Sequence, residues 1–301
     1  MQHGARAGVA SAGGKALAAT RVTYSAAKSL ASGLRQASNL ADRYRSMLIE
    51  YENPVRLTGD VTARRIFSPL AYALVRHANV VPVVLPEAWS LAAWFPVVWH
   101  RTGQTYDLVA VRSLMPAGRG YLPAVERLPG LLPLILQAYP FLPDPSLYPA
   151  AGAARLIDDV IADAPTDIGA PILVADKRPT KATRLRLGML DLFARHWSNT
   201  RSLGSDLAAL DLFEPWDLNF DINGRNVGIS ELYIVRQHAF GPGALAPVVA
   251  RHGSMAAQLL ALHRISLFRA GSLLGAARIA NGAHAQSEQG NDTTIRSGGS
   301  A

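Results

Sequence analysis

The stretch "WDLNFDINGRNVGISELYIV", residues 216–235, alternates apolar and polar side chains and contains an Asn-Gly pair. Four apolar residues before that pair fall on one face of an extended strand: Trp216, Leu218, Phe220 and Ile222. Asp217 and Asp221 fall on the opposite face. Asn223 and Gly224 tolerate positive φ, which predicts the turn of a β-hairpin with "VGISELYIV" as its returning strand. We therefore expect the apolar face to cover a core and the two carboxylates to face solvent.

A calcium-binding loop is the alternative interpretation of the same stretch, because "NFDINGRNVGISE" approximates the spaced oxygen ligands of an EF-hand. Counted from Asn219, the loop departs from that pattern at the positions that matter. The first ligand is Asn rather than Asp, and Asn226 stands where an apolar residue is expected. The last ligand position holds Ser230, with Glu231 one place late. The hairpin is therefore favoured over the metal site.

Outward from this hairpin, other runs rich in β-branched and aromatic residues predict neighbouring, mostly antiparallel strands. These runs are Asn79–Leu85, Trp94–His100 and Thr105–Arg112. Ala170–Asp176 predicts a further strand, and Pro123–Gln137 predicts a helix that ends before Tyr139. The hydrophobic period changes several times along the chain, which is typical of mixed α and β structure. We predict the α+β class, with mostly antiparallel sheets and packed helices in a single globular domain.

Two longer helices are predicted from apolar residues at helical spacing. The first covers residues 178–197, has Pro179 near its start, and carries the stripe Leu185, Met189, Leu192 and Phe193. The second follows Ser254, whose side chain can cap a helix N-terminus. Its stripe runs through Met255, Leu259, Leu262 and Leu267. Both stripes are expected to face the core.

The net charge of +8 lies mainly at the N-terminus. Residues 1–46 carry seven basic side chains against Asp42, which gives +6. Residues 279–301 carry Arg296 against Glu288 and Asp292, which gives −1 and leaves +3 for residues 47–278. Specific nucleic-acid binding is therefore not expected of the central part of the chain.

Both ends of the chain are poor in large apolar residues. We predict a disordered basic extension at residues 1–46, a domain at 47–278 and a disordered tail at 279–301. An organellar transit peptide is the alternative for residues 1–46, because they are Arg-rich and acid-poor. Prolines interrupt the two most apolar regions before they reach the roughly 20 residues that a membrane-spanning helix needs. Since no signal peptide is recognised either, a soluble, cytoplasmic protein without a membrane span is expected.

Several kinds of chemistry can be set aside from composition and motifs. The chain has no cysteine, which excludes disulfides, thiolate nucleophiles and cysteine-bound zinc. It contains neither a G-x-S-x-G nor an H-E-x-x-H motif. His100 and His196 each stand beside a tryptophan and are interpreted as residues at the edge of the core. We predict no metal or cofactor, and the patterns indicate no catalytic residue.

Two clusters of charge remain. The acidic one contains Asp158, Asp159, Asp163 and Asp167, in a segment typical of a short strand and a loop. We interpret these acids as solvated, with a metal site as the alternative. The basic one precedes and enters the helix at 178–197, with Lys177, Arg178, Lys181, Arg184, Arg186 and Arg195. It is interpreted as a solvated helix face, since aromatic residues for nucleic-acid stacking are not interleaved with it.

Short signatures recur in order along the chain. They are "ENPV" (52–55), "NVVP" (79–82), "FPVVW" (95–99), "YPF" (139–141), "LFEP" (212–215) and "HRISL" (263–267). Taken together, over about residues 47–274, they resemble the SapC family of bacterial proteins. The segment from Arg112 to Leu131 departs from the family pattern, because it lacks an Asn and a Gly-Trp turn expected there.

The resemblance implies an association with bacterial surface layers, and with neighbouring outer-membrane receptor, cupin-like and flavin-dependent halogenase-like proteins. It brings no catalytic residues. Our first hypothesis is an accessory or binding protein with an unknown protein partner, such as a surface-layer or outer-membrane receptor component. The alternative is an enzyme that modifies peptides or glycans, with a site built from His100, Asp158 and Glu231. Convergence of these residues in a closed pocket would favour the enzyme, and separate positions on open surface the binding protein.

Overall fold

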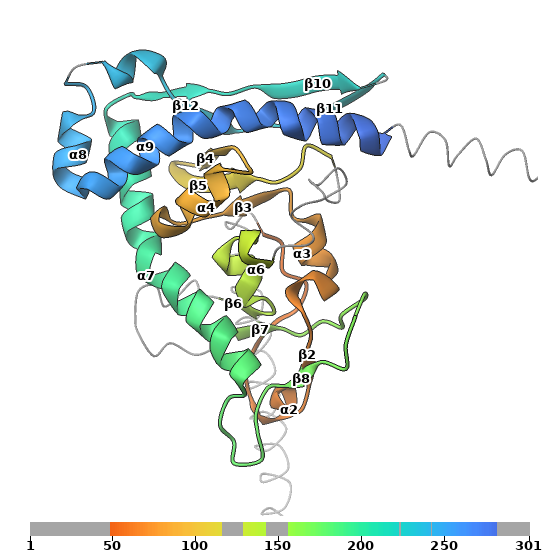
Figure 1. Ribbon diagram of the computed structural model, residues 1–301. Coiled ribbons are helices and arrows are strands. Elements are labelled where there is room, and N and C mark those ends of the chain that lie inside the picture. Colours follow the sequence, from red (N-terminus) through yellow and green to blue (C-terminus); the bar gives the residue numbers. More distant parts are fainter. Residues whose placement is uncertain (1–48, 116–128, 143–155, 223, 242, 282–301) are drawn as a thin grey trace, which may run out of the picture. The chain divides into compact units, whose positions relative to one another are not determined.

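The computed structural model describes residues 49–115, 129–142, 156–222, 224–241 and 243–281. Within these ranges the largest sheet is antiparallel, with strand order β3-β5-β4-β12-β9 (Figure 1). Its strands are β3 (Val80–Pro82), β4 (Val97–Thr102), β5 (Thr105–Val111), β9 (Phe213–Pro215) and β12 (Leu232–Val235). In the β4–β5 hairpin, Val97 lies opposite Ala110 and Thr102 opposite Thr105. The three strands predicted as antiparallel neighbours are confirmed.

The remaining elements surround this sheet or form smaller sheets. The longer helices are α7 (Lys181–Ala209), α8 (Ala246–His252) and α9 (Ser254–Ser266), followed by the 3₁₀ turn η6 (Leu267–Arg269) and helical residues 270–281. Short helices are α2 (Gly59–Thr62), α3 (Ala73–His77), α4 (Ala88–Ala92) and α6 (Leu134–Ala138). The 3₁₀ turns are η1 (Pro69–Ala71), η2 (Leu85–Glu87), η4 (Pro129–Leu131) and η5 (Gln237–Phe240). The smaller sheets are β1-β7-β6, with β1 (Pro54–Arg56), β6 (Phe141–Leu142) and β7 (Leu156–Asp158), and β2-β8, with β2 (Arg65–Ile66) and β8 (Ala170–Pro171). The fold belongs to the α+β class, as predicted.

The central strands β4 and β5 are buried on both faces, which explains their nearly continuous apolar sequence. Trp99 points to one face and packs in a core with side chains of α4, α7 and α9. Val98 points to the other face and packs with the ribbon of β10 (Leu218–Ile222) and β11 (Arg225–Ile229) and with residues 270–281. Successive residues of one strand thus supply two separate cores, as the alternation of strand side chains requires.

The predicted hairpin is present, but its returning strand is shorter than expected. β10 (Leu218–Ile222) and β11 (Arg225–Ile229) pair so that Ile222 lies opposite Arg225, across a two-residue turn in which Gly224 has φ 77°. Leu218 and Ile222 are buried, and Asp217 and Asp221 are exposed, as predicted. Glu231 has φ 59°, which ends the pairing and redirects the chain into β12 between β4 and β9. The prediction of a single returning strand over residues 227–235 is therefore wrong.

Helix α7 extends 12 residues beyond the predicted segment, which ended at Trp197, to Ala209. Thr180 caps it, since its Oγ1 accepts a hydrogen bond from the backbone N–H of Thr183 at 3.2 Å. The predicted stripe is partly wrong, because Phe193 is buried but Leu185 is 55% exposed. The buried face contains the polar residues Thr183 and Arg186, so a search for apolar residues alone assigned the wrong face.

Three other predicted elements are also modified. Helix α9 begins at Ser254, but its N-cap position is Gly253, and Met255 is 46% exposed although Leu259 is buried. The strand predicted at Ala170–Asp176 has only the two residues of β8, after which Lys177 adopts φ 62° in a turn. Of the helix predicted at Pro123–Gln137, residues 123–128 lie outside the described ranges, and α6 covers only the end.

The described chain reaches slightly beyond the predicted end of the domain. Helical residues continue to Asn281, whose side-chain Nδ2 donates to the carbonyl oxygen of Ile222 at 3.0 Å, whereas the boundary was predicted at 278. The predicted extension at 1–46, and residues 282–301 of the tail predicted at 279–301, lie outside the described residues. Among the residues that are described, no helix is both long and apolar enough to cross a membrane.

Candidate functional site

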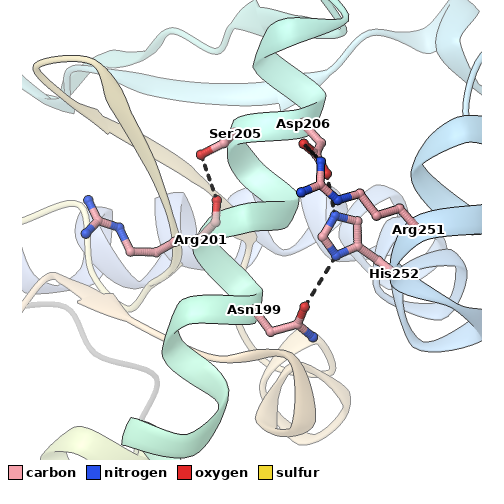
Figure 2. Close-up of polar contacts among 6 residues, drawn as sticks. All are labelled: Asn199, Arg201, Ser205, Asp206, Arg251 and His252. Atoms are coloured by element: carbon pink, nitrogen blue, oxygen red, sulfur yellow. Dashed lines mark hydrogen bonds and ion pairs between the residues drawn. The ribbon is translucent and has the colours of Figure 1, made fainter. Parts of the chain in front are cut away.

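A polar cluster joins α7 to α8 (Figure 2). The His252 Nε2 atom lies 2.6 Å from Asp206 Oδ2, and the Arg251 guanidinium lies 2.8 Å from the other carboxylate oxygen. The second ring nitrogen, His252 Nδ1, is 3.4 Å from Asn199 Oδ1. Asn199 and Asp206 lie about two turns apart on the same face of α7. The two basic residues end α8, where positive charge is favourable for the helix dipole.

This His–Asp pair was not singled out from the sequence, because its members are 46 positions apart. A nucleophile is needed beside the imidazole for hydrolase chemistry of the Ser-His-Asp type. The neighbouring Ser205 instead donates its hydroxyl to the carbonyl oxygen of Arg201 at 3.1 Å, and both His252 nitrogens face Asn199 and Asp206 (Figure 2). The geometry fits a brace between two helices.

A second cluster brings together two of the sequence signatures. The Asp158 carboxylate accepts hydrogen bonds from the Tyr139 hydroxyl at 2.7 Å and from the backbone N–H groups of Asn53 and Glu52 at 2.6 and 3.2 Å. Burial, and next the Asp158 charge, raise the pKa of Tyr139. The interpretation of Asp158 as a solvated loop acid is wrong, since it is 1% exposed on β7. Three separate chain segments meet at this carboxylate.

Arg186 extends the same cluster from α7. Its guanidinium donates to the carbonyl oxygens of Tyr139, at 2.8 Å, and Phe67. It is buried, and this burial lowers its pKa. The predicted solvated basic face is therefore wrong at Arg186, although Lys181, Arg184 and Arg195 are exposed. The long side chain secures two irregular segments to the helix.

The other acids of the predicted cluster have individual partners. Asp159 pairs with Arg64 at 2.7 Å, Asp163 pairs with Arg76, and Asp167 accepts from the backbone N–H of Gly169 at 2.8 Å. In the part of the chain that the structure describes, no group of three or more His, Asp or Glu side chains is placed to hold a metal ion.

The proposed enzyme residues His100, Asp158 and Glu231 lie in two places. His100 and Glu231 lie near each other where β12 begins to pair with β4, and the backbone N–H of Arg101 donates to the Glu231 carbonyl oxygen at 2.9 Å. Burial lowers the pKa of His100, and the Glu231 charge opposes that effect. Asp158 belongs to the separate β1-β7-β6 sheet (Figure 1). His196 is half-buried on α7, and its carbonyl oxygen accepts from Thr200 Oγ1.

The "HRISL" signature has a structural explanation in the described chain. His263 Nδ1 donates to the Val97 carbonyl oxygen at 2.7 Å, and its Nε2 accepts from the Val235 N–H at 3.2 Å. Ser266 Oγ accepts from the Val97 N–H at 2.9 Å. Burial lowers the pKa of His263 to about 4, so the neutral ring holds α9 on strands β4 and β12.

Glu87 is a second buried group that sequence reasoning missed. Its two oxygens accept from the backbone N–H groups of Val84, at 2.8 Å, and Leu134, at 2.6 Å. Burial raises the pKa of Glu87 to about 8. The available signal was one acid inside the apolar run "VVPVVLPEAWSL". The carboxyl group links η2 to the first turn of α6 and so stabilises the fold.

The described surface also has an open groove of about 640 Å³ between η5 and α9. Its lining includes Gln237, Phe240, Arg264 and Ile265. The Arg264 guanidinium lies 5.9 Å from the Phe240 ring centroid and donates to Gln237 Oε1 at 3.3 Å. His238 also belongs to the lining, and the rest of it is largely apolar, as is typical of a binding groove.

These features define an α+β protein whose buried polar groups join its elements and whose groove lies open on the surface. Comparison of the sequence with known families matches residues 63–269 to the SapC family model. The chain therefore belongs to the SapC family. No curated protein and no solved structure matches it.

Proposed function

We propose that this chain is a non-catalytic accessory protein that binds a protein partner in bacterial surface-layer or outer-membrane receptor processes. The observation that carries this proposal is the separation of His100 and Glu231 from Asp158, on two different sheets. Residues of one catalytic centre must lie within hydrogen-bond reach of a common substrate. Asp158, moreover, is buried and already accepts three hydrogen bonds.

Family membership supports the cellular setting of the proposal, since the family takes its name from surface-layer association. The Asp206–His252 pair does not favour an enzyme either, because both ring nitrogens of His252 face oxygens of α7. Under the binding hypothesis, these polar clusters hold the elements of the fold together and have no catalytic role.

Affinity purification of the tagged full chain from its own cells, followed by mass spectrometry, tests the proposal. We expect a surface-layer or outer-membrane receptor component to be enriched over a tag-only control, and to bind the purified chain directly. A double variant, His100→Ala with Glu231→Gln, should capture the same partner. Turnover of a peptide or glycan by the purified chain, abolished in that variant, would contradict the proposal.

A further inference from the structure

The helical run from Ser254 to residue 281 is apolar on two opposite faces. Leu259, Leu273 and Ala277 are buried on the inner face. On the outer face, Ile265, Phe268 and Ile279 are exposed by 62, 85 and 76%. At 3.6 residues per turn, these three side chains form one row on the side away from the core. A helix on a protein surface normally presents polar residues there.

The apolar surface continues from this row onto the neighbouring segment. Ile265 also lines the groove beside η5, together with Phe240, which is 37% exposed. From Ala261 to Ile279 the row extends about 27 Å along the helix, at 1.5 Å per residue. Phe268 and Ile279 are not part of the groove lining, so beyond Ile265 the row protrudes as a ridge.

Within the segment that carries the row, the charged side chains have one sign only. Residues 232–281 contain five arginines and neither Asp nor Glu. Arg236 pairs with Asp211, and Arg251 with Asp206, both on segments outside this range. Arg264, Arg269 and Arg278 have no acidic partner within the described residues, and they flank the apolar row along its length. The ridge is therefore complementary to an apolar layer bordered by negative charge.

We propose that the outer face of residues 261–279 binds peripherally to an anionic lipid surface. Interfacial helices of this type insert apolar side chains at the boundary between headgroups and acyl chains and place Arg or Lys against the phosphates. A bilayer accommodates a protruding row without a matching groove. This inference does not depend on the function proposed above.

Sedimentation of the full chain with vesicles tests the inference. We compare vesicles of phosphatidylcholine alone with vesicles of equal parts phosphatidylcholine and phosphatidylglycerol. The wild-type chain should bind the anionic vesicles and not the neutral ones. The variant Phe268→Ser with Ile279→Ser should bind about tenfold more weakly or worse, from the loss of buried apolar side chains. Replacing Arg264, Arg269 and Arg278 by Gln should also weaken binding.

A matched control is Ile168→Ser, since Ile168 is 84% exposed on the loop before β8. This variant should bind as the wild type does. The apolar double variant leaves every charge in place, including those of residues 1–46, so it separates insertion from electrostatic attraction. All the substituted side chains except the half-buried Arg264 are exposed, and unchanged thermal melts should confirm that the variants fold.

The inference is overturned if the wild type ignores anionic vesicles, or if it binds neutral vesicles equally well. It is also overturned if the Phe268 and Ile279 double variant binds as tightly as the wild type. Light scattering tests whether a second copy of the chain or an acidic protein occupies this face instead of lipid. A double variant that loses self-association, or binding to an acidic protein, while its vesicle binding stays unchanged would assign the ridge to a protein contact instead.

Discussion

His263 links α9 to two strands through the two nitrogens of one ring. The ring must be neutral to accept from the Val235 N–H, and burial accordingly lowers the pKa of His263 from 6.5 to about 4. Between these values the unfolded chain binds the proton and the folded chain does not, so stability falls as the pH drops. At pH values below the pKa of His263 in the folded chain, this group causes no further loss of stability.

The variant His263→Gln isolates this dependence, because glutamine does not titrate. The free energy of unfolding of the wild type, relative to the variant, should decrease by about 3 kcal/mol between pH 7 and pH 4. Urea denaturation at several pH values measures the difference. An advantage of the wild type that is constant over this range would show that the pKa of His263 is not lowered in the folded chain.

Glu87 should have the opposite pH dependence. Burial raises the pKa of Glu87 from 4.5 to about 8, so its contribution is complete below pH 4.5 and is lost as the pH rises through 8. Glu87→Gln should destabilise the fold by about 1–3 kcal/mol at pH 6, because an amide nitrogen cannot accept from a backbone N–H, whereas both oxygens of the neutral carboxyl group can. Urea denaturation at pH 6 and pH 9 should show a smaller difference at the higher pH. Equal stability at pH 6 would contradict the two-acceptor role of this carboxyl group.

At the scale of elements, α7 approaches β5 so closely that one position must be glycine. A Cβ atom on Gly204 would lie 2.5 Å from the carbonyl oxygen of Tyr106. Gly204→Ala should therefore destabilise the fold by about 1–3 kcal/mol through overpacking. Gly188→Ala in the same helix is the matched control, since nothing lies within 4 Å of that position, and it should stabilise by up to about 1 kcal/mol. Thermal melts of both variants test the pair, and similar effects would refute the close-approach argument.

The β10–β11 turn should depend on its glycine and not on its carboxylate charge. Gly224 has φ 77°, which a β-branched residue resists, so Gly224→Val should lower the melting temperature. Asp221 Oδ1 accepts from the Gly224 N–H at 2.9 Å, and asparagine keeps that acceptor. Asp217→Asn with Asp221→Asn should thus change stability by no more than about 0.5 kcal/mol per site. A melting temperature that rises with calcium, only in the wild type, would reverse the preference for a hairpin over a metal site.

The sequence predicted elements well where a local pattern determines them. The alternation from Trp216 to Ile222 and the Asn-Gly turn were enough for the hairpin, and the β-branched runs were enough for β3, β4 and β5. The predicted faces of α7 and α9 were less accurate, because buried polar residues such as Arg186 and His263 interrupt the apolar stripes. Their partners are backbone carbonyl and N–H groups of segments distant in the chain, which a local pattern does not contain.

For the whole molecule, the polar contacts that join one element to another were the least predictable part. Asp158 meets Asn53 across 105 positions, and His252 meets Asp206 across 46. The acids were visible in the sequence, but their burial follows only from the order in which the strands pair. For the same reason the separation of Asp158 from His100 and Glu231 could not be decided before the topology was known.

The hydrogen bonds to Asp158 indicate where the folded domain starts. The backbone N–H groups of Glu52 and Asn53 both donate to the buried Asp158 carboxylate, and Ile49 is 2% exposed. A chain that starts at Met47 keeps these contacts, so removing residues 1–46 should leave the melting temperature nearly unchanged. A chain that starts at Pro54 leaves a buried carboxylate without two donors, and should lose several kcal/mol of unfolding free energy or fail to fold. Thermal melts of both truncated chains, with limited proteolysis of the full chain, measure this boundary. Unfolding of the chain that starts at Met47 would show that residues 1–46 belong to the fold.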